Sequence, residues 1–215
     1  LGARRVSEWR DGITLYEKAL QRTEGNWMAH YAYAVELGER GSASEAIPHF
    51  QEVLRLKPDH EQAILNLGVA YEQTGRPDDA FRMYGEAVSR KPQYGKARFR
   101  LGIALRDRGM FREAAVQLRE AVRFLPDHPD VGTNLGYCLL LAGEPDGAIP
   151  YLERAYRQRP DDFPIRYSLG LALLQGGRTE EAVIHLREAL RIDPSNDRAR
   201  ADLATALSRR GAGNR

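Results

Sequence analysis

Residues 61–94 read EQAILNLGVAYEQTGRPDDAFRMYGEAVSRKPQY, and this stretch predicts two helices joined by a turn. Small and apolar residues recur in each half at the three- and four-residue spacing of a helix: Leu65, Gly68 and Tyr71 in the first half, Ala80, Tyr84 and Ala87 in the second. Gly75 breaks the pattern between the halves, and Pro92 ends the second helix because proline lacks an amide hydrogen. We expect Gly68 and Ala80 to lie where the two helices cross.

The pattern of this stretch returns every 34 residues along the chain. Four rows of residues keep the interval: Gly68, Gly102, Gly136 and Gly170; Gly41, Gly75, Gly109, Gly143, Gly177 and Gly211; Ala46, Ala80, Ala114, Ala148 and Ala182; and Pro58, Pro92, Pro126, Pro160 and Pro194. Such a period indicates a repeat architecture, in which each helix pair must stack on its neighbours to complete a core.

The period divides the chain into five full units, which are 27–60, 61–94, 95–128, 129–162 and 163–196. We expect residues 1–26 to hold the second helix of a truncated repeat, and residues 197–215 to form a capping helix and tail. The capping helix is strongly charged, as a terminal repeat with a solvated outer face should be. Because the chain begins at Leu1 with half a repeat, we expect it to be the soluble tail of a larger protein.

Composition excludes several classes of protein. The 215 residues are 42% hydrophobic, which is more than a disordered chain carries. Lysine and arginine total 32 against 30 aspartates and glutamates, so binding to nucleic acid through phosphate neutralisation is not expected. No run of about 18 apolar residues could span a bilayer.

A search for catalytic and metal-binding patterns predicts no enzyme, no cofactor and no metal site. The sequence has no glycine-rich phosphate loop, and HExxH, CxxC and GxSxG motifs are also absent. His49 and His185 share one repeat phase four units apart, as do His60 and His128 two units apart, so these pairs cannot converge on one ion. We interpret all histidines as structural or surface residues, and Cys138 as a packed small apolar residue.

The repeated residues resemble the tetratricopeptide repeat (TPR), whose pattern is Leu-Gly, then Tyr, Gly, Ala, an aromatic residue, Ala and Pro. The resemblance covers residues 27–196, although the early tryptophan of the pattern is replaced by His30, Ile64, Arg98, Gly132 and Arg166. It implies an all-α fold, a right-handed superhelix (α-solenoid) of antiparallel helix pairs whose first helices line a concave groove. Proteins of this kind bind an extended peptide or protein segment in that groove.

The groove positions of successive units supply the candidate binding residues, which are Tyr31, Asn66, Lys96, Phe99, Arg100, Asn134, Tyr137 and Tyr167. Asn66, Lys96 and Arg100 resemble three members of the carboxylate clamp of TPR co-chaperones. Tyr31 and Val35 stand where that clamp has lysine and asparagine, which counts against a soluble co-chaperone. Asn66 and Asn134 also resemble groove asparagines that hold a peptide backbone in other TPR proteins.

The distribution of charge suggests the chemistry of the ligand. Unit 95–128 has eight basic and four acidic residues, a net charge of +4, while the other four units carry between −3 and 0. An acidic segment should therefore be drawn to the middle of the array. The four groove aromatics would then be apolar anchors for its side chains.

A second resemblance concerns the N-terminal stretch EWRDGITLYEKAL at residues 8–20, followed by Trp27 and His30. It is similar to the junction between the last membrane span and the TPR array in protein O-mannosyltransferase-like membrane proteins. The resemblance implies an array on the non-cytoplasmic side of a membrane, with any catalytic residues upstream of this chain. The alternative is that Trp9 and Trp27 simply pack the first joint between helices.

These observations favour a non-enzymatic protein–protein interaction module with a protein or peptide ligand. The alternative is an accessory domain of a membrane glycosyltransferase that presents acceptor proteins, and a soluble co-chaperone is the least favoured interpretation. We expect no binding to nucleic acid, no membrane insertion by this chain, and a monomer or weak self-association through the N-terminal half-repeat. Localisation is left open between the extracytoplasmic face of a membrane and the cytoplasm.

Overall fold

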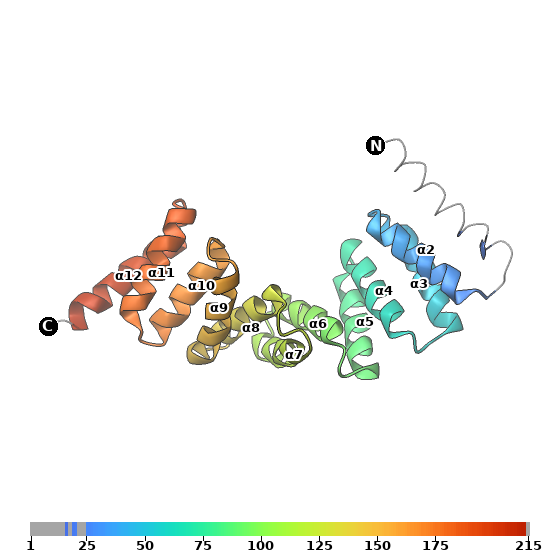
Figure 1. Ribbon diagram of the computed structural model, residues 1–215, viewed down its shortest axis with the longest axis horizontal. Helices are drawn as coiled ribbons and strands as arrows, with labels where there is room; N and C mark the ends of the chain where they lie inside the picture. Colours follow the sequence, from blue (N-terminus) through green and yellow to red (C-terminus); the bar gives the residue numbers. More distant parts are fainter. Residues whose placement is uncertain (1–15, 17–18, 21–24, 214–215) are drawn as a thin grey trace. The chain divides into compact units, whose positions relative to one another are not determined.

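The computed structural model describes residues 16, 19–20 and 25–213 of the chain (Figure 1). Every regular element in this part of the chain is an α-helix. The predicted half-repeat at residues 1–26, including Trp9, lies almost entirely outside the described residues. The chain forms two compact units, Leu1–Ala97 and Arg98–Arg215.

The described part of the first unit contains four complete helices, which are α2 (Trp27–Glu39), α3 (Ala43–Leu56), α4 (Glu61–Gln73) and α5 (Pro77–Arg90). The boundary between the units falls within α6 (Gly95–Asp107). The second unit continues with α7 (Phe111–Phe124), α8 (Pro129–Leu141), α9 (Pro145–Gln158), α10 (Phe163–Gln175), α11 (Thr179–Ile192) and α12 (Asp197–Gly213). From α2 to α5, and again from α7 to α12, each helix packs against the next along the chain.

Glycines close the first helix of each repeat in the same way. At the end of α4, Gly75 has a φ of +73°, in the left-handed region that glycine adopts without strain. Its amide donates to the Glu72 carbonyl at 3.1 Å, and the next amide, of Arg76, donates to the Tyr71 carbonyl at 2.8 Å. This pair of bonds is the Schellman motif, which satisfies carbonyls that the helix leaves without partners. Gly211 differs from the rest of its row, because it lies inside α12.

The row of glycines in the first helices marks the points where helices cross. A Cβ atom added to Gly68 would lie 2.6 Å from a ring carbon of Tyr84, on the paired helix α5. The same construction at Gly136 would meet Leu152 on α9, also at 2.6 Å. Real Cβ atoms do not approach other atoms so closely, so the helices can pair at this distance only because these residues are glycine. The predicted crossing at Gly68 is therefore confirmed.

Different side chains replace the early tryptophan of the TPR pattern, and their partners differ from repeat to repeat. His30 Nδ1 lies 2.9 Å from His49 Nδ1, and Arg98 donates to the Gln117 side chain at 2.7 Å. In the last repeat, Arg166 and His185 both pack on the ring of Tyr156. These three repeats thus fill the same space with different side chains.

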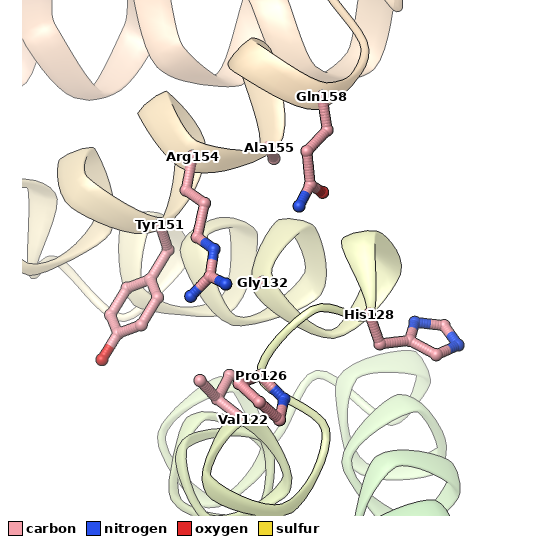
Figure 2. A pocket seen from close by; sticks show the side chains of 8 residues that line it. All are labelled: Val122, Pro126, His128, Gly132, Tyr151, Arg154, Ala155 and Gln158. Atoms are coloured by element: carbon pink, nitrogen blue, oxygen red, sulfur yellow. The ribbon is translucent and has the colours of Figure 1, made fainter.

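Gly132 leaves this space partly unfilled in the fourth repeat. A hollow of about 20 Å³ remains there, lined by the ends of α7 and α9 and by Gly132 itself. Figure 2 shows Arg154 pointing toward Val122 and Pro126 across this hollow, while the His128 ring points away from it. A volume of this size holds about one water molecule, so the hollow is too small for a ligand.

Candidate peptide-binding groove

Two of the predicted groove residues meet in the first unit. Tyr31 lies on α2 and Asn66 on α4, and the Asn66 amide donates to the Tyr31 hydroxyl at 3.3 Å. The Tyr31 ring packs on His60, with 4.6 Å between ring centroids. Burial raises the pKa of Tyr31 above its ordinary value, so its hydroxyl stays neutral and can also donate a hydrogen bond.

A cleft of about 300 Å³ lies beside this pair, between α2 and α4. We call it the Gly38 cleft, and it is lined by Ala34, Val35, Gly38, Glu39, Phe50, Asn66, Val69, Ala70 and Gln73. Asn66 is the only lining residue among the predicted binding residues. Gly38 keeps the cleft open, because a Cβ atom added there would meet nothing within 4 Å. The sequence signal was present but weak, since a single glycine inside a helical pattern has several explanations.

The three predicted residues of α6 have different surroundings. Lys96 is exposed, Arg100 is half-buried, and Phe99 packs against the ring of His128 with 5.3 Å between centroids. Two more basic side chains of this repeat bond to other groups of the protein: Arg98 donates to Gln117, and Arg108 donates to the Ala104 carbonyl at 3.0 Å.

Asn134 in the second unit is already engaged by its neighbours. The Arg106 guanidinium donates to its side-chain oxygen, and its amide nitrogen donates to the Asp130 carbonyl at 2.8 Å. A peptide backbone would have to displace Arg106 to reach this side chain. Asn134 and Asn66 thus differ, although they occupy the same repeat position.

The last two predicted residues are aromatic. Tyr137 on α8 is 40% exposed, a large fraction for an aromatic side chain. Tyr167 on α10 stacks on Phe163, and its hydroxyl donates to Asp202 on α12 at 2.6 Å. Burial and the Asp202 carboxylate together raise the pKa of Tyr167. The hydroxyl of Tyr167 therefore fixes α12 to α10, and only the ring of Tyr167 could contact a ligand.

In the part of the chain that the structure describes, the histidines and acidic residues form no cluster suited to a metal. His60 caps α4 by accepting from the Ala63 amide at 3.2 Å, which is a structural role. Across residues 25–213, no three or more histidine, cysteine, aspartate or glutamate side chains gather closely enough to hold an ion. None of the helices described is long and apolar enough to cross a bilayer.

The paired histidines His30 and His49 should make stability depend on pH. Burial lowers the pKa of both below the ordinary value of 6.5, and His30 lowers the pKa of His49 further. The unfolded chain then binds protons at a higher pH than the folded chain does. We expect the free energy of unfolding to be constant above pH 7 and to fall as the pH drops through 6.5, in urea titrations at successive pH values.

The charged groups nearest this pair, Glu52 and Arg55, act in opposite directions on the pKa of His30. A variant with His30→Arg and His49→Gln copies the Arg98–Gln117 pair of the third repeat, and serves as the control. It should lose part of the pH dependence, while His185, whose pKa is also lowered by burial, keeps the rest. An unchanged pH profile in this variant would contradict the assignment.

Cys138 should be chemically inert in the folded protein. Its side chain is fully buried in α8, and burial raises the pKa of the thiol to about 11. The thiolate is the reactive form, so little of it exists at pH 8. We expect Ellman's reagent to label Cys138 in urea but not in buffer. Rapid labelling of the native protein would show that α8 is less well packed than described.

Stacked helix pairs, with glycines at the crossings and Schellman turns after the first helices, define a class of repeat protein. Sequence profiles of the tetratricopeptide repeat match residues 65–129, 99–163 and 133–197, and a further one matches residues 39–80. The matches cover more than half of the 215 residues, and the chain belongs to the tetratricopeptide repeat family. The predicted all-α solenoid class is thereby confirmed.

Comparison with curated proteins gives partial matches to the protein O-mannosyl-transferase TMTC1. The human protein is 35% identical over 66 residues, which cover 31% of this chain and 8% of that protein. The mouse protein is 37% identical over 60 residues, or 28% of this chain and 6% of that protein. The chain therefore spans less than a tenth of these relatives. The matches agree with the resemblance seen in the sequence.

Solved structures with the same fold extend over most of the chain. YrrB, a TPR protein with an unusual peptide-binding site, has a TM-score of 0.77 at 21% identity, covering 86% of this chain and 95% of its own. MamA has a TM-score of 0.68 at 25% identity, covering 78% of this chain and 92% of its own. A TPR fold of this kind is a protein–protein interaction module, and it is typically non-catalytic.

Proposed function

We propose that the first helices of this chain bind an extended protein segment. The Gly38 cleft carries the proposal, because it is large enough for a side chain and lies beside the Tyr31–Asn66 pair. Binding sites in proteins commonly combine an apolar hollow with a few polar groups that fix orientation, and this cleft has both. YrrB, which shares this fold and has an unusual peptide-binding site, supports the same assignment.

The part of the ligand that contacts α6 is expected to be acidic. Lys96 is exposed on this helix, and Arg100 follows it by four residues, one helical turn later. A lysine charge and an arginine fork suit carboxylates, which accept several hydrogen bonds from them. Phe99 and Tyr137 would contribute apolar contacts, and their aromatic rings are typical of binding hot spots.

A phage library of random octapeptides tests this function with the whole chain as bait. Selection should enrich peptides that carry aspartate or glutamate together with large apolar residues. Synthetic copies should bind in isothermal titration calorimetry, and binding should weaken as salt is added. Failure to enrich any sequence over repeated rounds would overturn the proposal.

A second candidate function follows from the matches to TMTC1. In this alternative, the chain is an accessory domain that presents acceptor proteins to the catalytic part of a membrane glycosyltransferase. The observation in its favour is the 35% identity over 66 residues. The reading frame upstream of Leu1 tests it: several apolar spans of about 20 residues would support it, and further TPR units in their place would contradict it.

A further inference from the structure

The Gly38 cleft exists because one repeat position carries no side chain in the first repeat. Gly38 is the twelfth residue of its unit, and its counterparts are Glu72, Arg106, Leu140 and Leu174. Leu140 and Leu174 are buried, and Arg106 reaches from α6 to Asn134 on α8. Asn134 is the counterpart of Asn66. The space that Arg106 fills between α6 and α8 therefore corresponds to the cleft between α2 and α4.

The walls of the cleft determine what it can accept. Its floor is apolar: Phe50 is 3% exposed and Ala34 is fully buried, and Val35 and Val69 stand on opposite helices. Water in such a hollow finds few hydrogen-bond partners, so an apolar side chain should displace it favourably. The volume of about 300 Å³ suits a large apolar side chain.

The rim of the cleft adds polar and charged groups. The Asn66 amide nitrogen is bonded to Tyr31, and within the described part of the chain its side-chain oxygen has no donor. That oxygen can accept a backbone amide of a bound peptide. Glu39 is the one charged residue that lines the cleft, and the neighbouring Arg40 pairs with Glu36 at 2.9 Å rather than with it.

We propose that the Gly38 cleft binds a large apolar side chain of a peptide residue that has lysine or arginine next to it. The apolar side chain would pack between Val35, Phe50 and Val69, and the neighbouring cation would pair with Glu39. This inference rests on the proposed peptide-binding function and specifies its sequence preference at this position. The cleft would thus prefer a basic residue of the ligand, whereas α6 would prefer an acidic one.

Filling the cleft tests the inference. Gly38→Leu introduces the residue found at positions 140 and 174, and the new side chain meets no atom at its Cβ. Peptides selected from the random octapeptide library on the unaltered chain should bind this variant about tenfold more weakly or worse, because a buried apolar contact is lost. Gly38→Ala is the matched control: it removes the same glycine, leaves most of the volume, and should bind nearly as tightly.

A second variant tests the charge. Glu39→Gln keeps the size of the side chain and removes its carboxylate, so selection on this variant should lose the preference for lysine or arginine next to the apolar residue. Peptides that bind Gly38→Leu as tightly as the unaltered chain would overturn the inference. If such peptides still required Lys96 and Arg100, the proposed function would stand without this subsite, whereas a library that enriched nothing would overturn both.

Discussion

Replacing Gly136 by alanine will destabilise the second unit by about 2 kcal/mol, and replacing Gly132 by alanine will stabilise it by about 0.5–1 kcal/mol. The two glycines lie four residues apart on α8, in the same helical conformation. Only their surroundings differ. Comparing the two variants therefore separates the effect of steric crowding from the effect of the low helix propensity of glycine.

At Gly136, the new Cβ would lie 2.6 Å from Leu152 Cγ and 3.3 Å from the Ala148 carbonyl oxygen. Leu152 is fully buried, so it has little room to move away, and the helices would have to separate. At Gly132, the nearest atom would be the Tyr151 carbonyl oxygen at 3.9 Å, an ordinary contact. Alanine there adds a methyl group beside the hollow of Figure 2 and restricts the unfolded chain.

Urea denaturation followed by circular dichroism measures both changes, with the unaltered chain as reference. The midpoint should fall for Gly136→Ala and rise for Gly132→Ala. If both variants moved in the same direction, crowding at the helix crossing would not be what requires glycine at position 136.

Removing the two cations of α6 should have the largest effect on binding. Lys96→Ala combined with Arg100→Ala is expected to weaken the binding of acidic peptides by about tenfold to a hundredfold at low salt. The salt dependence of binding should also become shallower, because two charges no longer attract the ligand. Isothermal titration calorimetry at two salt concentrations measures both quantities.

A control for net charge is available on the paired helix. Arg112→Ala with Arg119→Ala removes the same charge from two exposed positions of α7, seven residues apart. This variant should keep most of the affinity if Lys96 and Arg100 act by local contact. Equal losses in the two double variants would mean that the overall charge of the region is responsible, and that α6 is not the binding element.

The repeat period was sufficient to predict the helices and the glycine crossings. Gly75 and Gly136 recur because every helix pair needs the same turn and the same close approach, so their rows are visible in one sequence. Gly211 shows the limit of this reasoning. It keeps the interval but lies inside α12, so the interval alone does not predict a turn there.

The candidate site was less predictable because its geometry depends on residues that do not recur. The period identifies Asn66 and Asn134 as equivalent, but it does not show that Arg106 occupies only the second of them. The link from Tyr167 to Asp202 joins residues 35 positions apart and depends on the side chain that the capping helix presents. The Gly38 cleft likewise results from one missing side chain in one repeat.

The residue pairs that replace the early tryptophan, such as His30–His49 and Arg98–Gln117, differ between repeats. This difference should help each helix to find its correct partner during folding. Similar repeats can pair out of order, so that the first helix of one repeat packs on the second helix of another. Such an exchange would place Arg98 against His49, or His30 against Gln117, and would break the hydrogen bonds of both correct pairs. Tyr151 holds the same repeat position as His49 and Gln117. If Arg166 were placed against Tyr151, it would lose its contact with Tyr156. The chemical variety at this one position thus favours each helix pairing with its own neighbour.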